Sequence, residues 1–260
     1  DGRVIRKVIT GMVFIIGGEN NLAIGPCLDN INQVVNFINN RFIEHLLNKD
    51  CLLLHAAAIS WQGKGFAVAG FSGAGKSTLS LHMMGHDLEF ISNDRLLMRV
   101  EDSKLTMYGV IKYPRINPGT IINNKDIESL IPPEERTRLK KMPLEELWNL
   151  EQKYDLFIDK VYGPDKFKVS SEMKGLIILN WKRTTDPIVI NEIALKNRPD
   201  LFPAFMKSPG LFYRYNDNSP DLSEDNYQSL LSKCTVYEVT GGYDFKAAAE
   251  FFAKKLKNEG

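Results

Sequence analysis

Long apolar runs and paired cysteines are both absent from this sequence. No stretch approaches the roughly 18 consecutive apolar residues that a membrane span needs, so no span is predicted. The three cysteines, Cys27, Cys51 and Cys234, form no C-x-x-C pair, which argues against a zinc site and against a disulfide framework. We interpret them as buried thiols in a reducing compartment.

An excess of charge of one sign is also lacking. Lysine and arginine number 33, aspartate and glutamate 32, and the net charge is +1. This balance gives no electrostatic reason to expect a nucleic acid or an anionic membrane as partner. Residues 1–4 lack the basic start and the long apolar run of a signal peptide, so we expect a cytoplasmic protein.

The apolar patterns that are present predict strands alternating with helices. Alternating or continuous short apolar runs predict strands at 4–16 and 22–24 (a hairpin), 52–54, 56–59, 66–69, 88–91, 96–100, 105–110, 176–180, 188–195 and 236–239. Spacings of three and four predict helices at 34–47, from 76 onward and at 245–256. We therefore expect an α/β fold, a mixed β-sheet flanked by helices, in one domain over residues 1–260 with a hairpin and a helix at 1–50.

The segment 114–170 differs from its surroundings. It is polar, contains Pro132-Pro133, and carries a charged run from Glu134 to Lys141. We interpret it as a helical insertion or flap that lies outside the core. Long polar insertions often serve as lids, so this segment is a candidate for closing over a site.

A glycine-rich motif lies between a predicted strand and a predicted helix. The run Gly70-Phe71-Ser72-Gly73-Ala74-Gly75-Lys76-Ser77 fits the P-loop pattern G-x-x-x-x-G-K-[ST] at every fixed position. Glycines let the backbone wrap a phosphate, and the loop and helix N–H groups present partial positive charge to it. The nucleotide-binding residues that we expect are Gly70, Ser72, Gly73, Ala74, Gly75, Lys76, Ser77 and Thr78. The structural alternative is a glycine-rich turn with an exposed lysine.

The chemistry of the motif indicates the nucleotide and the metal. Lys76 supplies a full charge for the β- and γ-phosphates, and Ser77 offers a hydroxyl to Mg²⁺. The guanine-specific N-K-x-D motif is absent, so we expect ATP in preference to GTP. A P-loop alone does not name a reaction, because kinases, ATPases and simple nucleotide binders all use one.

A second group of polar residues surrounds the motif in sequence. Asp94 ends a short predicted strand, where a carboxylate can hold Mg²⁺, orient water or accept a proton; the alternative is a turn cap. Asn93 is a metal or phosphate contact or a turn residue. His55 ends an apolar run and is otherwise a core histidine. Candidate phosphate clamps, each otherwise a solvent-facing arginine, are Arg95, Arg115 and Arg183.

Taken together, these residues resemble the catalytic domain of HPr kinase/phosphorylase, a family of bacterial protein-serine kinases. His55, Lys76 and Asp94 match the family's histidine, lysine and second aspartate. More closely, the chain is similar to the HPr-kinase-related kinases, in the phrases Asn36-Phe37-Ile38-Asn39-Asn40-Arg41, Leu54-His55-Ala56-Ala57, Ser92-Asn93-Asp94-Arg95, Pro114-Arg115-Ile116-Asn117-Pro118-Gly119 and Val239-Thr240-Gly241-Gly242. The match is firm over residues 36–120.

The resemblance implies a fold akin to phosphoenolpyruvate carboxykinase, with Asp94 as the base that takes the hydroxyl proton and Ser77 as a ligand of Mg²⁺. It also implies a homo-oligomer. The chain departs from the family at Asn93, which replaces the first aspartate of the usual pair. A counterpart of the family's later glutamate ligand is lacking near Thr106-Met107-Tyr108-Gly109-Val110. We do not carry over HPr as acceptor, nor the reverse reaction.

The leading hypothesis is an ATP-dependent kinase that phosphorylates a hydroxyl on a protein serine or a small molecule. Lys76 would stabilise the transferring phosphoryl group, and His55 would orient Asp94 or touch phosphate. Asn93 and the missing glutamate favour an alternative, an ATP-binding regulatory module that acts on a partner protein without turnover. A third hypothesis is a carboxykinase-like or hydrolytic enzyme.

Overall fold

The structure is a computed structural model that describes residues 2–17, 20–150 and 152–258. The chain forms two compact units. The N-terminal unit consists of Asp1–Leu53 with Ser208–Asp221, and the main unit consists of Leu54–Lys207 with Leu222–Gly260. The expectation of one domain over 1–260 stays a prediction, because compactness does not tell whether either unit folds alone.

The N-terminal unit contains a three-stranded antiparallel sheet in the order β1 (Gly2–Arg6), β2 (Val13–Gly17), β3 (Asn20–Ile24). The sequence predicted one hairpin here, with a single strand over 4–16. This prediction was wrong in one respect: the chain reverses between β1 and β2. Gly11 adopts φ 70° and donates its N–H to the Lys7 carbonyl at 2.8 Å. The apolar stretch is therefore two strands joined by a glycine turn.

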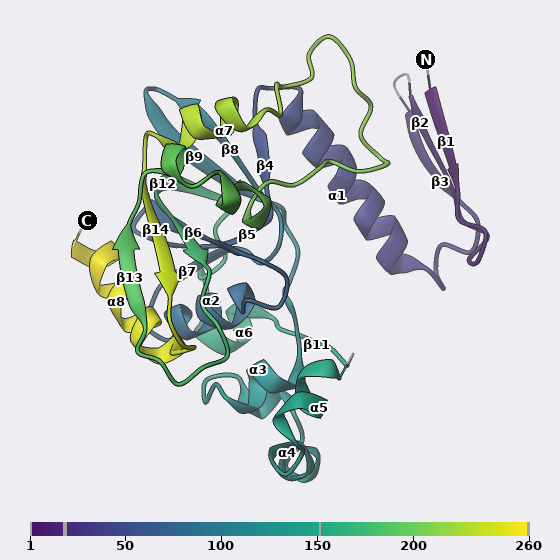
Figure 1. Ribbon diagram of the computed structural model, residues 1–260. Helices are drawn as coiled ribbons and strands as arrows, with labels where there is room; N and C mark the ends of the chain where they lie inside the picture. Colours follow the sequence, from purple (N-terminus) through teal and green to yellow (C-terminus); the bar gives the residue numbers. More distant parts are fainter. Residues whose placement is uncertain (1, 18–19, 151, 259–260) are drawn as a thin grey trace. The chain divides into compact units, whose positions relative to one another are not determined.

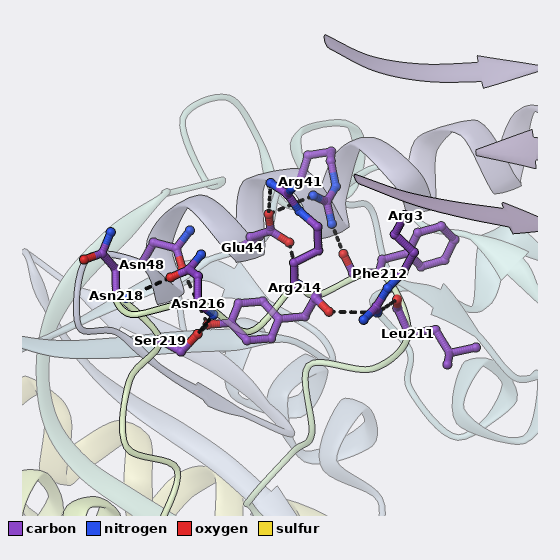
Figure 2. A network of polar contacts seen from close by, with 11 residues as sticks. Arg3, Arg41, Glu44, Asn48, Leu211, Phe212, Arg214, Asn216, Asn218 and Ser219 are labelled. Carbon is purple, nitrogen blue, oxygen red and sulfur yellow. Dashed lines mark hydrogen bonds and ion pairs between the residues drawn. The ribbon is translucent and has the colours of Figure 1, made fainter. Parts of the chain in front are cut away.

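Helix α1 (Ile31–Leu47) completes this unit, as its apolar spacing predicted. Phe37 lies against Phe14 of β2, with ring centroids 4.9 Å apart, and Phe212 of the returning segment joins the pair. The buried Glu44 of α1 holds two arginines, Arg41 at 3.0 Å and Arg214 at 3.5 Å (Figure 2). Segment 208–221 is thus fixed to α1 by charge-assisted contacts.

The main unit is built on a mixed β-sheet (Figure 1). Its strands are β5 (Ala56–Trp61), β6 (Lys64–Gly70), β7 (Glu89–Ser92), β8 (Leu96–Glu101), β9 (Lys104–Gly109), β12 (Ser170–Leu179), β13 (Val189–Glu192) and β14 (Thr235–Thr240), and β4 (Leu52–Leu54) spans the boundary between the units. The order is β8-β9-β12-β6-β5-β7, and β14 pairs with both β12 and β13. The predicted α/β class with a mixed sheet and flanking helices is confirmed.

The central strand β12 determines where the sheet ends meet. It runs parallel to β6 and β14, and antiparallel to β9 through its first residues. Leu179 is in register with Gly70, so the end of β12 lies beside the end of β6. Helices α2 (Lys76–Met84) and α8 (Phe245–Asn258) pack against each other and against β5 and β6. Both helices had been predicted from the sequence.

Segment 114–170 is helical, as predicted. It contains β10 (Arg115–Ile116), α3 (Pro118–Ile122), η1 (Glu128–Leu130), α4 (Pro133–Lys140), α5 (Leu144–Asn149), β11 (Tyr154–Asp155) and α6 (Ile158–Tyr162). The prediction that it lies outside the core was wrong. Ile121, Leu139 and Ile158 are fully buried in the same apolar cluster as Leu79 of α2. A few well-spaced apolar side chains anchor a segment whose average composition is polar.

The remaining pieces are short. They are η2 (Leu195–Asn197), η3 (Pro199–Ala204) and α7 (Glu224–Leu231), whose Ser223 cap accepts a hydrogen bond from the Asn226 N–H. The three cysteines are free, but only Cys51 is buried, so the prediction of three buried thiols was wrong for Cys27 and Cys234. Among the described residues, no helix combines the length and the apolar character needed to cross a bilayer.

Candidate active site

The glycine-rich loop, residues 70–76, connects the end of β6 to the start of α2. Gly73 and Gly75 adopt left-handed backbone angles, φ 77° and 88°, which residues with a Cβ rarely tolerate. A Cβ on Gly73 would meet nothing within 4 Å, whereas one on Gly75 would lie 2.5 Å from the Phe245 ring. Glycine is thus favoured at Gly73 by conformation alone, and at Gly75 by conformation and by contact.

Lys76 opens α2 and folds back over the loop. Its Nζ donates to the Gly70 carbonyl at 3.0 Å, across the mouth of the loop. Burial lowers the pKa of Lys76, the carboxylate of Asp94 opposes this effect, and the positive charge of Lys207 adds to it. The charges of Lys76 and Asp94 therefore interact, although one residue follows β6 and the other follows β7.

The residues after Lys76 belong to the first turn of α2. Ser77 is half-buried there, and Thr78 shares a hydrogen bond of 2.8 Å with Thr120 of α3. Through this bond, segment 114–170 contacts the helix that the glycine-rich loop opens. The loop and the first turn of α2 together contain every residue that the sequence assigned to nucleotide binding.

Asp94 lies in the bend after β7 and is contacted by three cationic or potentially cationic side chains. His55 Nε2 is 3.0 Å from Oδ1, and Oδ2 is 3.4 Å from Lys207 Nζ and 3.8 Å from Arg95 Nε. The hydrogen bond from His55 is the main reason that the pKa of Asp94 lies well below its usual range; Lys207, His55 and Arg95 lower it further through their charges. The carboxylate is held ionised while about half of it stays exposed.

His55 is positioned by the backbone between β4 and β5. The backbone N–H of His55 donates to the Phe205 carbonyl at 2.7 Å. The neighbouring β-bridge between Leu54 and Met206 brings Lys207 close to His55 and Asp94. Lys207 was not among the residues predicted from the sequence. It follows a loop with no motif, and only the pairing of Leu54 with Met206 places it beside Asp94.

Asn93 has a buried side-chain oxygen that accepts no hydrogen bond from any described residue. A buried acceptor without a donor is costly, and such atoms in native structures often meet a ligand, an ion or water. Ser77, Asn93 and Asp94 offer hydroxyl, amide and carboxylate oxygens, which are the donor types that Mg²⁺ prefers. These oxygens fit the expected ion, although the described residues contain no group of three or more His, Cys, Asp and Glu side chains suited to a metal.

The three candidate phosphate clamps have separate positions. Arg95 contacts Asp94, and Arg115 of β10 pairs with Asp155 at 3.4 Å. The charges of Arg95 and Arg115 also act on Lys112. Burial and then the charge of Arg95 lower the pKa of Lys112. Arg183 is exposed in the loop after β12, on the side of the sheet where the glycine-rich loop begins. Lys112 precedes Arg115 in an irregular stretch, and no sequence motif marked it.

Comparisons with known proteins gave a likeness to solved structures but none in sequence. No family model and no curated protein matches the sequence. The chain is similar to the Hpr(Ser) kinase/phosphatase from Coxiella burnetii, with 12% sequence identity and a TM-score of 0.41, over 80% of this chain and 89% of that one.

Proposed function

We propose that this protein is an ATP-dependent phosphotransferase that moves the γ-phosphoryl group of ATP to a hydroxyl, on a protein serine or on a small molecule. The observation that carries the proposal is the pairing of two features in one unit. A glycine-rich loop with left-handed glycines leads into Lys76, and an ionised carboxylate, Asp94, lies close enough to influence the pKa of that lysine. An anion-binding loop beside a proton acceptor is the arrangement that phosphoryl transfer to a hydroxyl requires.

Each residue has a role that its position supports. The N–H groups of the loop and the start of α2 would hold the β- and γ-phosphates, with Lys76 supplying full charge. Ser77, with Asp94 and the free acceptor oxygen of Asn93, would hold Mg²⁺. Such an ion, when bound, neutralises charge on the phosphate oxygens.

Asp94 would act on the acceptor. The acceptor hydroxyl oxygen forms a bond to the γ-phosphorus, the bond between that phosphorus and the β–γ bridging oxygen breaks, and ADP leaves with the electron pair. The hydroxyl proton goes to the Asp94 carboxylate. His55 and Lys207 hold that carboxylate from both of its oxygens, so its orientation is set before the acceptor binds.

The experiment is incubation with γ-labelled ATP and Mg²⁺, alone and with fractions of dialysed cell extract. Asp94→Asn is isosteric and should keep ATP affinity while losing label transfer. Asp87→Asn, at an exposed aspartate paired with Lys166, is the matched control and should transfer normally. Transfer that continues undiminished in Asp94→Asn would remove Asp94 from the role of base.

Two observations favour a second function, a nucleotide-binding regulatory module without turnover. The strongly lowered pKa of Asp94 makes it a weak base, and Asn93 stands where the resemblance implies a further carboxylate. ATP would then bias the conformation of a partner protein. Tight ATP binding by the wild type, with neither transfer nor hydrolysis in any fraction, would establish this function instead.

A further inference from the structure

An aromatic group, formed by His82, Trp181, Tyr243 and Phe245, packs beside the glycine-rich loop. Phe245 meets Trp181 edge to face at 4.8 Å, and His82 of α2 stacks on its ring at 6.0 Å with an interplanar angle of 11°. The ring centroids of Tyr243 and Trp181 lie 5.2 Å apart. The group joins the end of β12, the start of α8 and the body of α2, three elements far apart in the sequence.

This aromatic group makes two direct contacts with the loop. The indole Nε1 of Trp181 donates a hydrogen bond of 2.8 Å to the carbonyl of Ala74, and both residues are buried. The Phe245 ring lies against Gly75, so closely that a Cβ there would overlap it. Two neighbouring residues of the loop, Ala74 and Gly75, are therefore held by side chains from outside the motif.

The hydrogen bond has a consequence for anion binding. A loop binds phosphate through its N–H groups, so a carbonyl that turned toward the anion would repel it. The Ala74 carbonyl is buried and its partner is the indole, a group that can only donate. If the donor is lost, this carbonyl is left without a hydrogen bond. Rotation of the Ala74–Gly75 peptide toward water then becomes favourable.

We propose that Trp181 is a positioning residue for nucleotide binding, whose indole N–H fixes the Ala74 carbonyl and, together with Phe245, holds the glycine-rich loop in its anion-binding form before the ligand arrives. Trp181 acts through the loop and does not touch the phosphates itself. The inference rests on the proposed function only in taking the loop as the site of the triphosphate. It adds that a residue outside the P-loop motif sets the affinity.

The test is calorimetric titration of the full chain with Mg·ATP and, separately, with tripolyphosphate, a probe that contains the phosphates alone. Trp181→Phe keeps an aromatic ring at this position and removes the donor, together with the second ring of the indole. We expect its Kd to rise about tenfold for both probes, the effect of leaving one buried carbonyl unsatisfied in the bound form. Trp61→Phe, on β5 with Lys257 over its ring, is the matched control and should bind both probes like the wild type.

A merely structural role predicts a different result. It would lower the melting temperature of Trp181→Phe but leave both Kd values of the folded protein unchanged, and that outcome overturns the inference. If Trp181→Phe does not fold, Phe245→Leu removes the other contact and should weaken both probes in the same way; unchanged binding there overturns the inference too. A wild type that binds neither probe defeats the proposed function before any variant is compared.

Discussion

Gly75→Ala tests the local structure of the glycine-rich loop most directly. Two separate penalties act at this position. The backbone has φ 88°, a left-handed conformation, and an added Cβ would lie 2.5 Å from Cζ and 2.6 Å from Cε1 of Phe245. Real Cβ atoms do not approach an aromatic ring so closely, so the ring, the loop or both must move.

The two penalties have different sizes. A left-handed angle costs a residue with a Cβ about 1–2 kcal/mol, reduced by about 0.4–1 kcal/mol because alanine restricts the unfolded chain. Overpacking a close contact costs a further 1–3 kcal/mol, roughly. We therefore expect Gly75→Ala to lower the free energy of unfolding by about 2–4 kcal/mol.

The structure provides two controls that separate the penalties. Gly63, in the turn between β5 and β6, and Gly73, in the glycine-rich loop, have φ 80° and 77°, and a Cβ at either would meet nothing within 4 Å. Gly63→Ala and Gly73→Ala should cost only about 1 kcal/mol each. Urea denaturation of all three variants measures the difference, which reports the contact with Phe245.

The reasoning is refuted if Gly75→Ala costs no more than Gly63→Ala. A second check is the double variant Gly75→Ala with Phe245→Leu, because a smaller, flexible side chain should relieve the overlap. The two changes should then be less than additive by about 1 kcal/mol or more. Strict additivity would mean that the ring does not constrain the loop.

Three further predictions follow from charged and titratable groups. Burial lowers the pKa of His82 below its usual 6.5, so the unfolded chain binds more protons and stability should fall as pH drops below about 6.5; His82→Gln should flatten that dependence in melting curves. Glu44→Ala should destabilise by about 3–5 kcal/mol in urea denaturation, since it leaves two arginines without their buried carboxylate, and a loss under 1 kcal/mol would contradict this. Carbon NMR titration should show the pKa of Asp94 rising in both His55→Phe and Lys207→Met, and more in His55→Phe, whose hydrogen bond is the larger cause.

The sequence predicted the elements that carry the glycine-rich loop because their signals are local. Lys76 lies in a motif, and β6 and α2 are apolar patterns of the expected period. Asp94 and His55 were both predicted as site residues, and the structure brings them within 3.0 Å of each other. Their pairing depends on the antiparallel neighbours β5 and β7, which place the end of β7 near the start of β5.

Trp181 and Lys207 could not be found in this way. Trp181 reaches Ala74 only because β12 runs parallel to β6 in a particular register, and Lys207 reaches Asp94 only through a bridge at Leu54. Neither relation leaves a pattern in nearby residues. The prediction that segment 114–170 lies outside the core failed for a different reason. The segment is polar on average, and this average conceals single buried positions such as Ile121. Non-local packing determines these features, and composition does not reveal it.

The lowered pKa of Asp94 limits when it can take a proton. A carboxylate held by His55 and Lys207 is a poor base toward a free hydroxyl, whose pKa is far higher. The proton is therefore expected to move late, after the bond to phosphorus has begun to form, as a loose transition state allows. Since Asp94 stays ionised well below its ordinary pKa of 3.8, its protonation should not slow transfer between about pH 8 and pH 5. A rate that falls tenfold over this range, with the fall displaced to higher pH in Lys207→Met, would show that Asp94 is protonated there and that its cations do not hold it ionised.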